Sequence, residues 1–168
     1  MKITMENCNE QDVEALAKYF ACYLKNDNLI VTLDGEVGAG KTRFGSYFAT
    51  YFGYSSVFSS PTYSIMNIYD GELKVIYHFD LYRADESDYE WIFEYFDSEN
   101  ALKLVEWSSM HKELFEGYEM LSLFFEVVDE DHRNLVIGCD SLGLFERIKG
   151  GFGNDFIVHK ECNISFGN

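Results

Sequence analysis

Hydrophobic positions along the chain recur with two different spacings, and these spacings predict alternating helices and strands. Residues 9–25 place apolar or small side chains three to four positions apart, which is typical of a helix with one buried face. Asn9 is a suitable N-cap for this helix, because its short polar side chain can accept a hydrogen bond from the first turn. The same spacing predicts further helices over residues 41–52, 87–96 and 142–148.

Short runs rich in β-branched, aromatic and other apolar residues predict the strands. These runs are residues 29–33, 63–69, 73–79, 101–105, 120–128, 135–137 and 156–158. Asp70-Gly71 separates two of the runs and indicates a hairpin turn, and one or two helical turns are expected at 109–116. With 168 residues, the chain is expected to form one domain over residues 1–168, although its pattern weakens after about residue 138.

The segment LIVTLDGEVGAGKT, residues 29–42, joins a predicted strand to a predicted helix through a glycine-rich loop. It matches G-x-x-x-x-G-K-[ST], the pattern of the phosphate-binding loop (P-loop) of nucleoside triphosphatases. The glycines of such a loop let backbone N–H groups point inward, and the following helix directs its positive dipole at the same place. The lysine ammonium reaches the β- and γ-phosphates, and the threonine hydroxyl binds Mg²⁺. The predicted nucleotide-binding residues are Gly35, Glu36, Val37, Gly38, Ala39, Gly40, Lys41 and Thr42.

Two acidic residues each follow a predicted strand and are candidates for the rest of the site. A P-loop needs an acid to complete the Mg²⁺ shell, and this acid normally lies at the end of a neighbouring buried strand. Glu106 follows the run LKLV, and Asp80 follows VIYHF, where His78 shares one face of the strand with Asp80. One acid is expected to bind the metal and the other to orient water, although either alone could also be a strand-end acid that faces solvent.

A hydroxyl-rich loop over residues 54–63 follows the P-loop helix and contains Pro61, the single proline of the chain. Proline pushes the preceding residue into an extended conformation and breaks a helix. A loop in this position is where the switch loops of P-loop proteins sense the γ-phosphate. The spacing alone leaves two interpretations equally open, a sensor loop and an ordinary serine-rich connector.

The charge of the chain argues against direct binding of nucleic acid. Its formal net charge is −16, from 13 basic and 29 acidic residues, and no basic stripe is present. Binding to a phosphate backbone needs clustered lysine and arginine. The acidity is expected to keep the protein soluble, and it could also suit a basic protein partner.

The cysteines and the hydropathy pattern indicate a cytoplasmic protein. Cys8, Cys22, Cys139 and Cys162 are scattered, and they are expected to be reduced thiols. His159-x-x-Cys162 is too sparse to predict a metal site. No apolar run is long enough to cross a membrane, and the N-terminal segment lacks the apolar core of a secretory signal.

Three functions are compatible with the P-loop: an ATPase, a small-molecule or nucleotide kinase, and a nucleotide-binding scaffold without useful turnover. The chain lacks Asn-Lys-x-Asp, the guanine-binding signature of GTPases, so ATP is the expected nucleotide. It has only four arginines, and kinases usually need several to clamp acceptor phosphates. The arginine count therefore disfavours the kinase.

Together these motifs resemble one family, the bacterial tRNA threonylcarbamoyladenosine biosynthesis ATPase TsaE. The resemblance covers roughly residues 10–137, with the motifs in the order and spacing of the family. Besides the P-loop, the matching segments are Ser60-Pro61-Thr62-Tyr63, His78-Phe79-Asp80-Leu81-Tyr82-Arg83 and Val105-Glu106-Trp107.

This resemblance implies an α/β P-loop domain with a mixed central sheet, flanking helices and weak ATP hydrolysis. It implies that Thr42 and Glu106 hold Mg²⁺, that Asp80 lies beside the γ-phosphate, and that Thr62 lies in a switch-like loop. Arg133 stands about where the family often has a basic residue near the nucleotide. The implied partners are TsaD and TsaB, which attach threonylcarbamoyl to adenosine 37 of tRNA, so tRNA would be met only through the complex.

Two positions depart from the family pattern. Ser108 stands after Glu-Trp, where the family usually has proline, and Arg43 follows Lys-Thr, where a second threonine is common. The start of the first helix also lacks a clear Ser/Thr signature, which leaves the adenine contacts unassigned.

Overall fold

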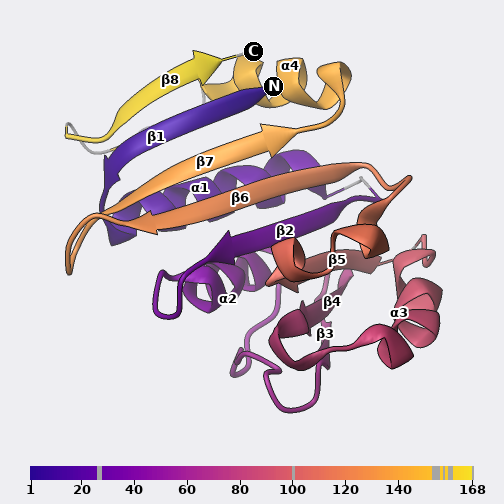
Figure 1. Ribbon diagram of the computed structural model, residues 1–168. Helices are drawn as coiled ribbons and strands as arrows, with labels where there is room; N and C mark the ends of the chain where they lie inside the picture. The colour runs from indigo at the N-terminus through magenta and orange to yellow at the C-terminus, as the bar shows by residue number, and fades with distance from the viewer. Residues whose placement is uncertain (26–27, 100, 153–155, 157, 159–160, 168) are drawn as a thin grey trace.

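A single mixed sheet runs through the computed structural model (Figure 1), which describes residues 1–168 except 26–27, 100, 153–155, 157, 159–160 and 168. The strands are β1 (Lys2–Cys8), β2 (Ile30–Gly35), β3 (Met66–Asp70), β4 (Val75–Asp80), β5 (Ala101–Glu106), β6 (Met120–Val127), β7 (Arg133–Cys139) and β8 (Asn163–Gly167). The α-helices are α1 (Glu10–Leu24), α2 (Lys41–Tyr51), α3 (Tyr89–Phe96) and α4 (Leu142–Phe152). Short 3₁₀ turns occur at Leu81–Arg83, Glu86–Asp88, Ser108–Met110 and Lys112–Phe115.

The strand order is β3-β4-β5-β2-β6-β7-β1-β8, and the strands β4, β5, β2 and β6 are parallel to one another. The remaining strands β3, β7, β1 and β8 pair antiparallel with their neighbours. The α/β fold with a mixed central sheet and flanking helices is therefore confirmed. In the parallel part, the carboxyl ends of β2, β5 and β4 meet at one edge, which is where such sheets bind ligands.

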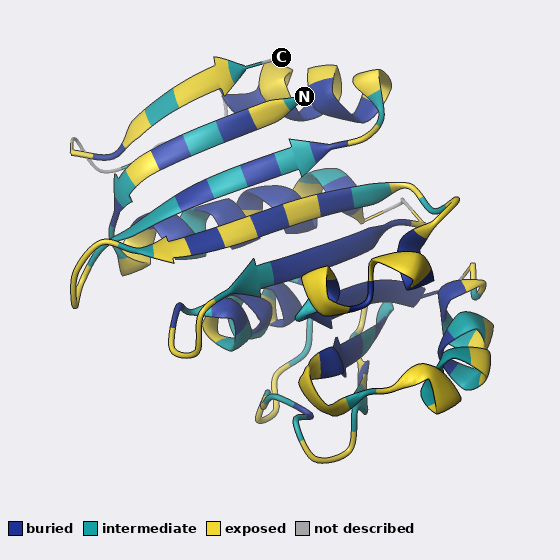
Figure 2. Cartoon of the chain, in the orientation of Figure 1, coloured by how far each residue is buried: buried dark blue, intermediate teal, exposed yellow. Residues whose placement is uncertain are grey.

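The helices cover the sheet unevenly, and the burial of each strand follows from this cover. Helices α1 and α2 pack on one face, and α3 with the 3₁₀ turns packs on the other face, against β2, β5 and β4 (Figure 1). All six residues of β5 are buried, whereas β6 alternates buried and exposed residues because its outer face is open (Figure 2). A strand covered on both faces gives a continuous apolar run, and a half-covered strand alternates.

Most predicted elements are present with boundaries shifted by a few residues. Asn9 caps α1 as expected, and its side chain and that of Asp12 form a capping box. The predicted hairpin forms, but its first strand begins at Met66 rather than at Tyr63. The earlier start was wrong because the chain turns after Pro61, where the N–H groups of Ser64 and Ile65 both donate to the Pro61 carbonyl.

Two strands of the antiparallel half, β1 and the edge strand β8, were missed. Strand β1 was not predicted, and the last described strand is β8 rather than the expected run at 156–158. Of that run, position 157 lies outside the described residues, and Phe156 and Val158 are not in a strand. No helix in the described part of the chain is long and apolar enough to cross a membrane.

Candidate active site

The P-loop lies between β2 and α2, at the carboxyl edge of the parallel strands. Gly38 and Gly40 have positive φ angles of 79° and 109°, which curl the backbone in a way that side-chain-bearing residues rarely adopt. A Cβ atom at Gly35 would lie 2.4 Å from the Phe125 carbonyl oxygen, because the start of the loop packs directly on β6. Among the described residues, no side chain caps the start of α2 at Gly40, so its first N–H groups are available to an anion.

The Lys41 ammonium is folded back onto its own loop. Its Nζ donates to the carbonyls of Gly35 at 2.8 Å and Glu36 at 2.9 Å, and it lies 3.9 Å from the centre of the Trp107 ring. Burial lowers the pKa of Lys41, while the neighbouring acids Glu106 and Asp80 act in the opposite direction. The Lys41 ammonium is therefore held at the position where the sequence pattern predicts that phosphate binds.

Thr42 and Glu106 come together beside the loop. The Thr42 hydroxyl donates to Glu106 Oε1 at 2.8 Å, although the two residues are 64 positions apart in sequence. Glu106 is the last residue of β5, which pairs with β2 in the register Leu33↔Glu106. A hydroxyl and a carboxylate side by side form a hard oxygen donor pair of the kind that Mg²⁺ prefers.

His78, on the neighbouring strand β4, contacts the Glu106 carboxylate. Its Nε2 lies 3.0 Å from Glu106 Oε1, and because a carboxylate only accepts, Nε2 carries the proton. The imidazole is fully buried and stacks on the Phe58 ring, with centroids 4.6 Å apart and planes 17° apart. Its other nitrogen, Nδ1, has no hydrogen-bond partner among the described residues.

Asp80 lies next to Glu106, because the parallel strands β4 and β5 pair in the register Asp80↔Glu106. Its Oδ2 accepts hydrogen bonds from the hydroxyls of Ser60 and Thr62, both at 2.5 Å, and its Oδ1 accepts from the Tyr82 N–H at 3.1 Å. The Ser60 and Thr62 side chains thus connect the Pro61 loop to this carboxylate by hydrogen bonds.

Two cavities flank the P-loop. The first, of about 480 Å³, contains the predicted phosphate and metal side: it is lined by Lys41, Thr42, Thr62, Asp80 and Glu106 together with Val37, Gly38, Gly40, Arg43, Ser60, Tyr82 and Trp107. The second, of about 280 Å³, lies on the other side of the loop and is lined by Asn9, Glu10, Val13, Gly38, Ala39, Gly40, Arg43, Phe125, Glu130, Asp131 and Arg133. Gly38, Gly40 and Arg43 line both cavities, so the two spaces meet across the loop.

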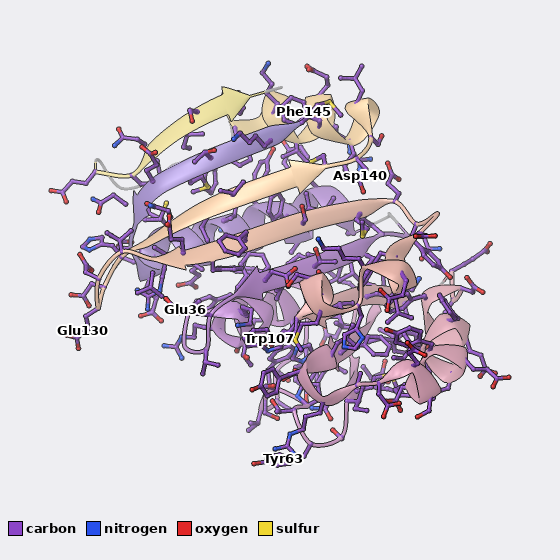
Figure 3. The ribbon with its side chains drawn as sticks, viewed as in Figure 1. Glu36, Tyr63, Trp107, Glu130, Asp140 and Phe145 are labelled. Carbon is purple, nitrogen blue, oxygen red and sulfur yellow. The ribbon has the colours of Figure 1, made fainter. Side chains whose placement is uncertain are left out.

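Arg133 lies beside the P-loop and faces the second cavity. Its Nε donates to the Ala39 carbonyl at 3.0 Å, and its Nη1 donates to the carbonyls of Asp129 at 2.7 Å and His132 at 2.8 Å. The turn between β6 and β7 that carries Glu130 projects beyond the loop (Figure 3). Arg133 thus lies beside the P-loop, and its contact with a nucleotide stays a prediction.

Several residues of the site were not among those predicted. His78, Ser60 and Trp107 stand within the quoted motifs, and the alternation that places His78 on the face of Asp80 was the signal for it. The walls of the second cavity, including Asn9 and Phe125, come from distant segments and carry no local signal.

The two departures from the family pattern have structural partners here. Ser108 donates to Asp34 Oδ2 at 2.5 Å, which ties the turn after β5 to the start of the P-loop. Arg43 pairs with Glu10 at 2.6 Å across the mouth of the second cavity, and Tyr47 donates to the same carboxylate at 2.5 Å.

Comparison with known proteins identifies the family of this chain. The family model "Threonylcarbamoyl adenosine biosynthesis protein TsaE" matches residues 7–135. The tRNA threonylcarbamoyladenosine biosynthesis protein TsaE of Bacillus subtilis is 34% identical over 128 residues, which cover 76% of this chain and 79% of the relative. The protein of the same name from Rickettsia felis is 38% identical over 128 residues, covering 74% of this chain and 73% of the relative.

A solved structure extends the likeness to the fold. The crystal structure of Bacillus subtilis YdiB matches with a TM-score of 0.73 and 25% identity, covering 91% of this chain and 95% of YdiB. The family model covers more than half of the chain, including the P-loop and both strand-end acids. The chain therefore belongs to the TsaE family.

Proposed function

We propose that the protein is a Mg²⁺-dependent ATPase that acts as a switch in the threonylcarbamoyl modification of tRNA. The observation that carries the proposal is the 2.8 Å hydrogen bond between Thr42 and Glu106 at the end of a P-loop. A hydroxyl and a carboxylate that lie together at the end of a P-loop are the groups that would hold a divalent ion beside a bound triphosphate.

The residues present fit both ATP and its metal. Uncapped N–H groups at the start of α2 and the Lys41 ammonium would bind the phosphates. Thr42 and Glu106 would hold Mg²⁺, which would neutralise charge on the β- and γ-phosphates. The adenine would lie in the second cavity, between Val13 and Phe125, with Arg133 near the nucleotide.

Lys41 has to change partners for this function. Its ammonium now donates to the carbonyls of Gly35 and Glu36, and phosphate oxygens would replace these two acceptors. Trp107 covers the same ammonium at 3.9 Å and would keep the stem of the side chain in place.

Asp80 connects the γ-phosphate side of the site to the Pro61 loop. A carboxylate that accepts from Ser60, Thr62 and the Tyr82 N–H is fixed in position and can accept one further hydrogen bond from a water molecule. A γ-phosphate that competes for the Ser60 or Thr62 hydroxyl would loosen the loop from Asp80. The sensor interpretation of the loop rests on this coupling.

The partners follow from the family and from the charge. A chain of net charge −16 would repel tRNA, so the tRNA would be held by the companion proteins TsaD and TsaB. In this scheme TsaD and TsaB carry out the transfer, and the ATP cycle of the present protein resets their complex between rounds.

Phosphate release in the presence of the partners tests the proposed function. We expect ATP hydrolysis to be slow for the protein alone and to rise at least about tenfold with the TsaB–TsaD pair, because completing a switch loop adds transition-state contacts. Release of inorganic phosphate is the measurement, and TsaB or TsaD added singly is the control. Transfer of the γ-phosphate to a metabolite instead of water would establish the kinase alternative.

Removing the hydrogen bond between His78 and Glu106 is expected to weaken the metal site. His78→Phe keeps a ring against Phe58 but leaves Glu106 without this donor, and the loss of such a supporting contact typically costs about 10-fold to 100-fold in metal affinity or activity. The measurement is the Mg²⁺ concentration that gives half-maximal ATP hydrolysis.

Two further variants separate this effect from general damage. His78→Gln restores an N–H donor and should recover most of the Mg²⁺ dependence. His132→Gln changes a histidine in the β6–β7 turn and should leave it unchanged. Equal Mg²⁺ requirements for His78→Phe and the wild type would show that His78 only fills space.

A further inference from the structure

Cys8 and Cys162 lie in contact although they are 154 positions apart in sequence. Their Sγ atoms are 2.7 Å apart, which is closer than two non-bonded sulfurs ordinarily approach. Cys8 is fully buried and Cys162 is 7% exposed. The fold therefore brings two of the four scattered cysteines into contact.

A bulge in β1 produces this pairing. Ile3 and Met5 point to the buried face, and strict alternation would place Asn7 there and turn Cys8 outward. Asn7 instead has a φ angle of 58°, and the register of β1 with β7 shifts between Met5 and Cys8. A bulge of this kind re-aims the side chain that follows it, so Cys8 is buried.

Cys162 stands immediately before β8 and reaches the same face of the sheet. The strand pairs with β1 in the registers Ile3↔Phe166 and Met5↔Ile164. Because alternate residues of a strand share a face, Cys162 lies on the face of Ile164 and Phe166. Both thiols therefore meet at the end of the β1–β8 ladder.

The chemistry of the pair favours a disulfide over a metal ion. Asp12 is also close enough to form a three-ligand cluster with the two thiols. However, two thiolates on one zinc ion, each at about 2.3 Å, would lie farther apart than these two sulfurs do.

We propose that Cys8 and Cys162 form a reversible disulfide that fastens the edge strand β8 to β1. The oxidant is a small-molecule disulfide of the glutathione class. The more exposed Cys162 attacks one of its sulfurs as a thiolate, the S–S bond of the oxidant breaks, and one small thiol leaves. The Cys8 sulfur then attacks Cys162, and the second small thiol leaves, so the protein loses two hydrogens and the oxidant gains them.

The cross-link would act on both ends of the chain at once. Cys162 directly precedes β8, whose described pairing is with β1 only. Cys8 directly precedes Asn9, which caps α1 and lines the second cavity. A closed loop of 154 positions restricts the unfolded chain strongly. Oxidation therefore stabilises the fold.

Equilibration in glutathione redox buffers tests this inference on the full-length protein. After alkylation of free thiols, we expect peptide mass mapping to find Cys8 joined to Cys162, with Cys22 and Cys139 alkylated. The oxidised protein should melt about 5–10 °C above the reduced protein, given the usual stabilisation by a disulfide. Addition of dithiothreitol should reverse both changes.

Matched variants make the result decisive. Cys162→Ser and Cys8→Ala should each remove the cross-link and the difference between the oxidised and reduced melting temperatures, even if they melt lower than the wild type. Cys22→Ser changes an exposed cysteine outside the pair and should keep both. The proposal is overturned if no Cys8–Cys162 cross-link forms in the folded protein. Stoichiometric Zn²⁺ binding that protects both thiols and is lost in Asp12→Asn would overturn it as well.

Discussion

Lys41→Ala is expected to abolish measurable ATP binding. The ammonium is the one cation of the P-loop sequence, and removing one partner of a buried, hydrogen-bonded charge pair weakens binding by at least about 30-fold. The structure adds a reason, because the ammonium already lies in the loop, where it donates to two loop carbonyls and lies 3.9 Å from the centre of the Trp107 ring. Titration of the protein with a fluorescent ATP analogue measures the loss.

Two controls accompany the Lys41 variant. Lys18→Ala removes an exposed lysine from α1 and should bind ATP as the wild type does. Lys41→Arg keeps the charge, but its planar guanidinium differs in shape from an ammonium and should recover little binding. The melting temperature of each variant establishes that it is folded. Wild-type affinity in a folded Lys41→Ala protein would contradict the assignment of the loop as the phosphate site.

Local rules made the centre of the fold and the site predictable from the sequence. The P-loop has to join a strand to a helix, and the parallel strands β2, β5 and β4 end at the same edge. The acids Asp80 and Glu106 are the last residues of β4 and β5, so predicting their proximity needed only the correct strand neighbours. The strand-end pattern alone did not choose between the two acids, and only the family resemblance assigned the metal to Glu106; in the structure Glu106 is in contact with Thr42.

Features that depend on distant partners could not be predicted. Asn7 and Ile65 both have positive φ angles, of 58° and 65°, in residue positions that look like ordinary strand. Ile65 is held there because its carbonyl accepts from the Asp80 N–H and its N–H donates to Pro61. Strand β1 escaped prediction because the bulge at Asn7 interrupts its alternation.

The position of the Lys41 ammonium in this structure likewise depends on tertiary contacts. Trp107 has a φ angle of 65°, and its N–H donates to the Leu33 carbonyl, which places the indole over the ammonium. No local pattern around Glu106-Trp107 encodes that turn. The contact exists only because β5 lies beside β2 in the sheet.

Glu106→Gln is expected to reduce Mg²⁺-dependent ATP hydrolysis by about 100-fold or more, because the proposed metal ligand loses its charge. Binding of ATP without Mg²⁺ should change by less than about threefold, since the P-loop contacts remain. Glutamine is preferable to alanine, because alanine would leave the buried His78 donor and the Thr42 hydroxyl without their acceptor. Hydrolysis across a Mg²⁺ series, with ATP binding measured in a chelator, gives both quantities.

The neighbouring acid provides the comparison that assigns the two roles. If Glu106 holds the metal and Asp80 positions water, Asp80→Asn should lower the maximal rate while leaving the Mg²⁺ concentration for half-maximal rate near that of the wild type. Glu106→Gln should instead shift that Mg²⁺ concentration upward. The opposite pattern would transfer the metal to Asp80. In that case the Ser60 and Thr62 hydroxyls, which now donate to Asp80, would lie beside the ion, and the Pro61 loop would sense the metal directly.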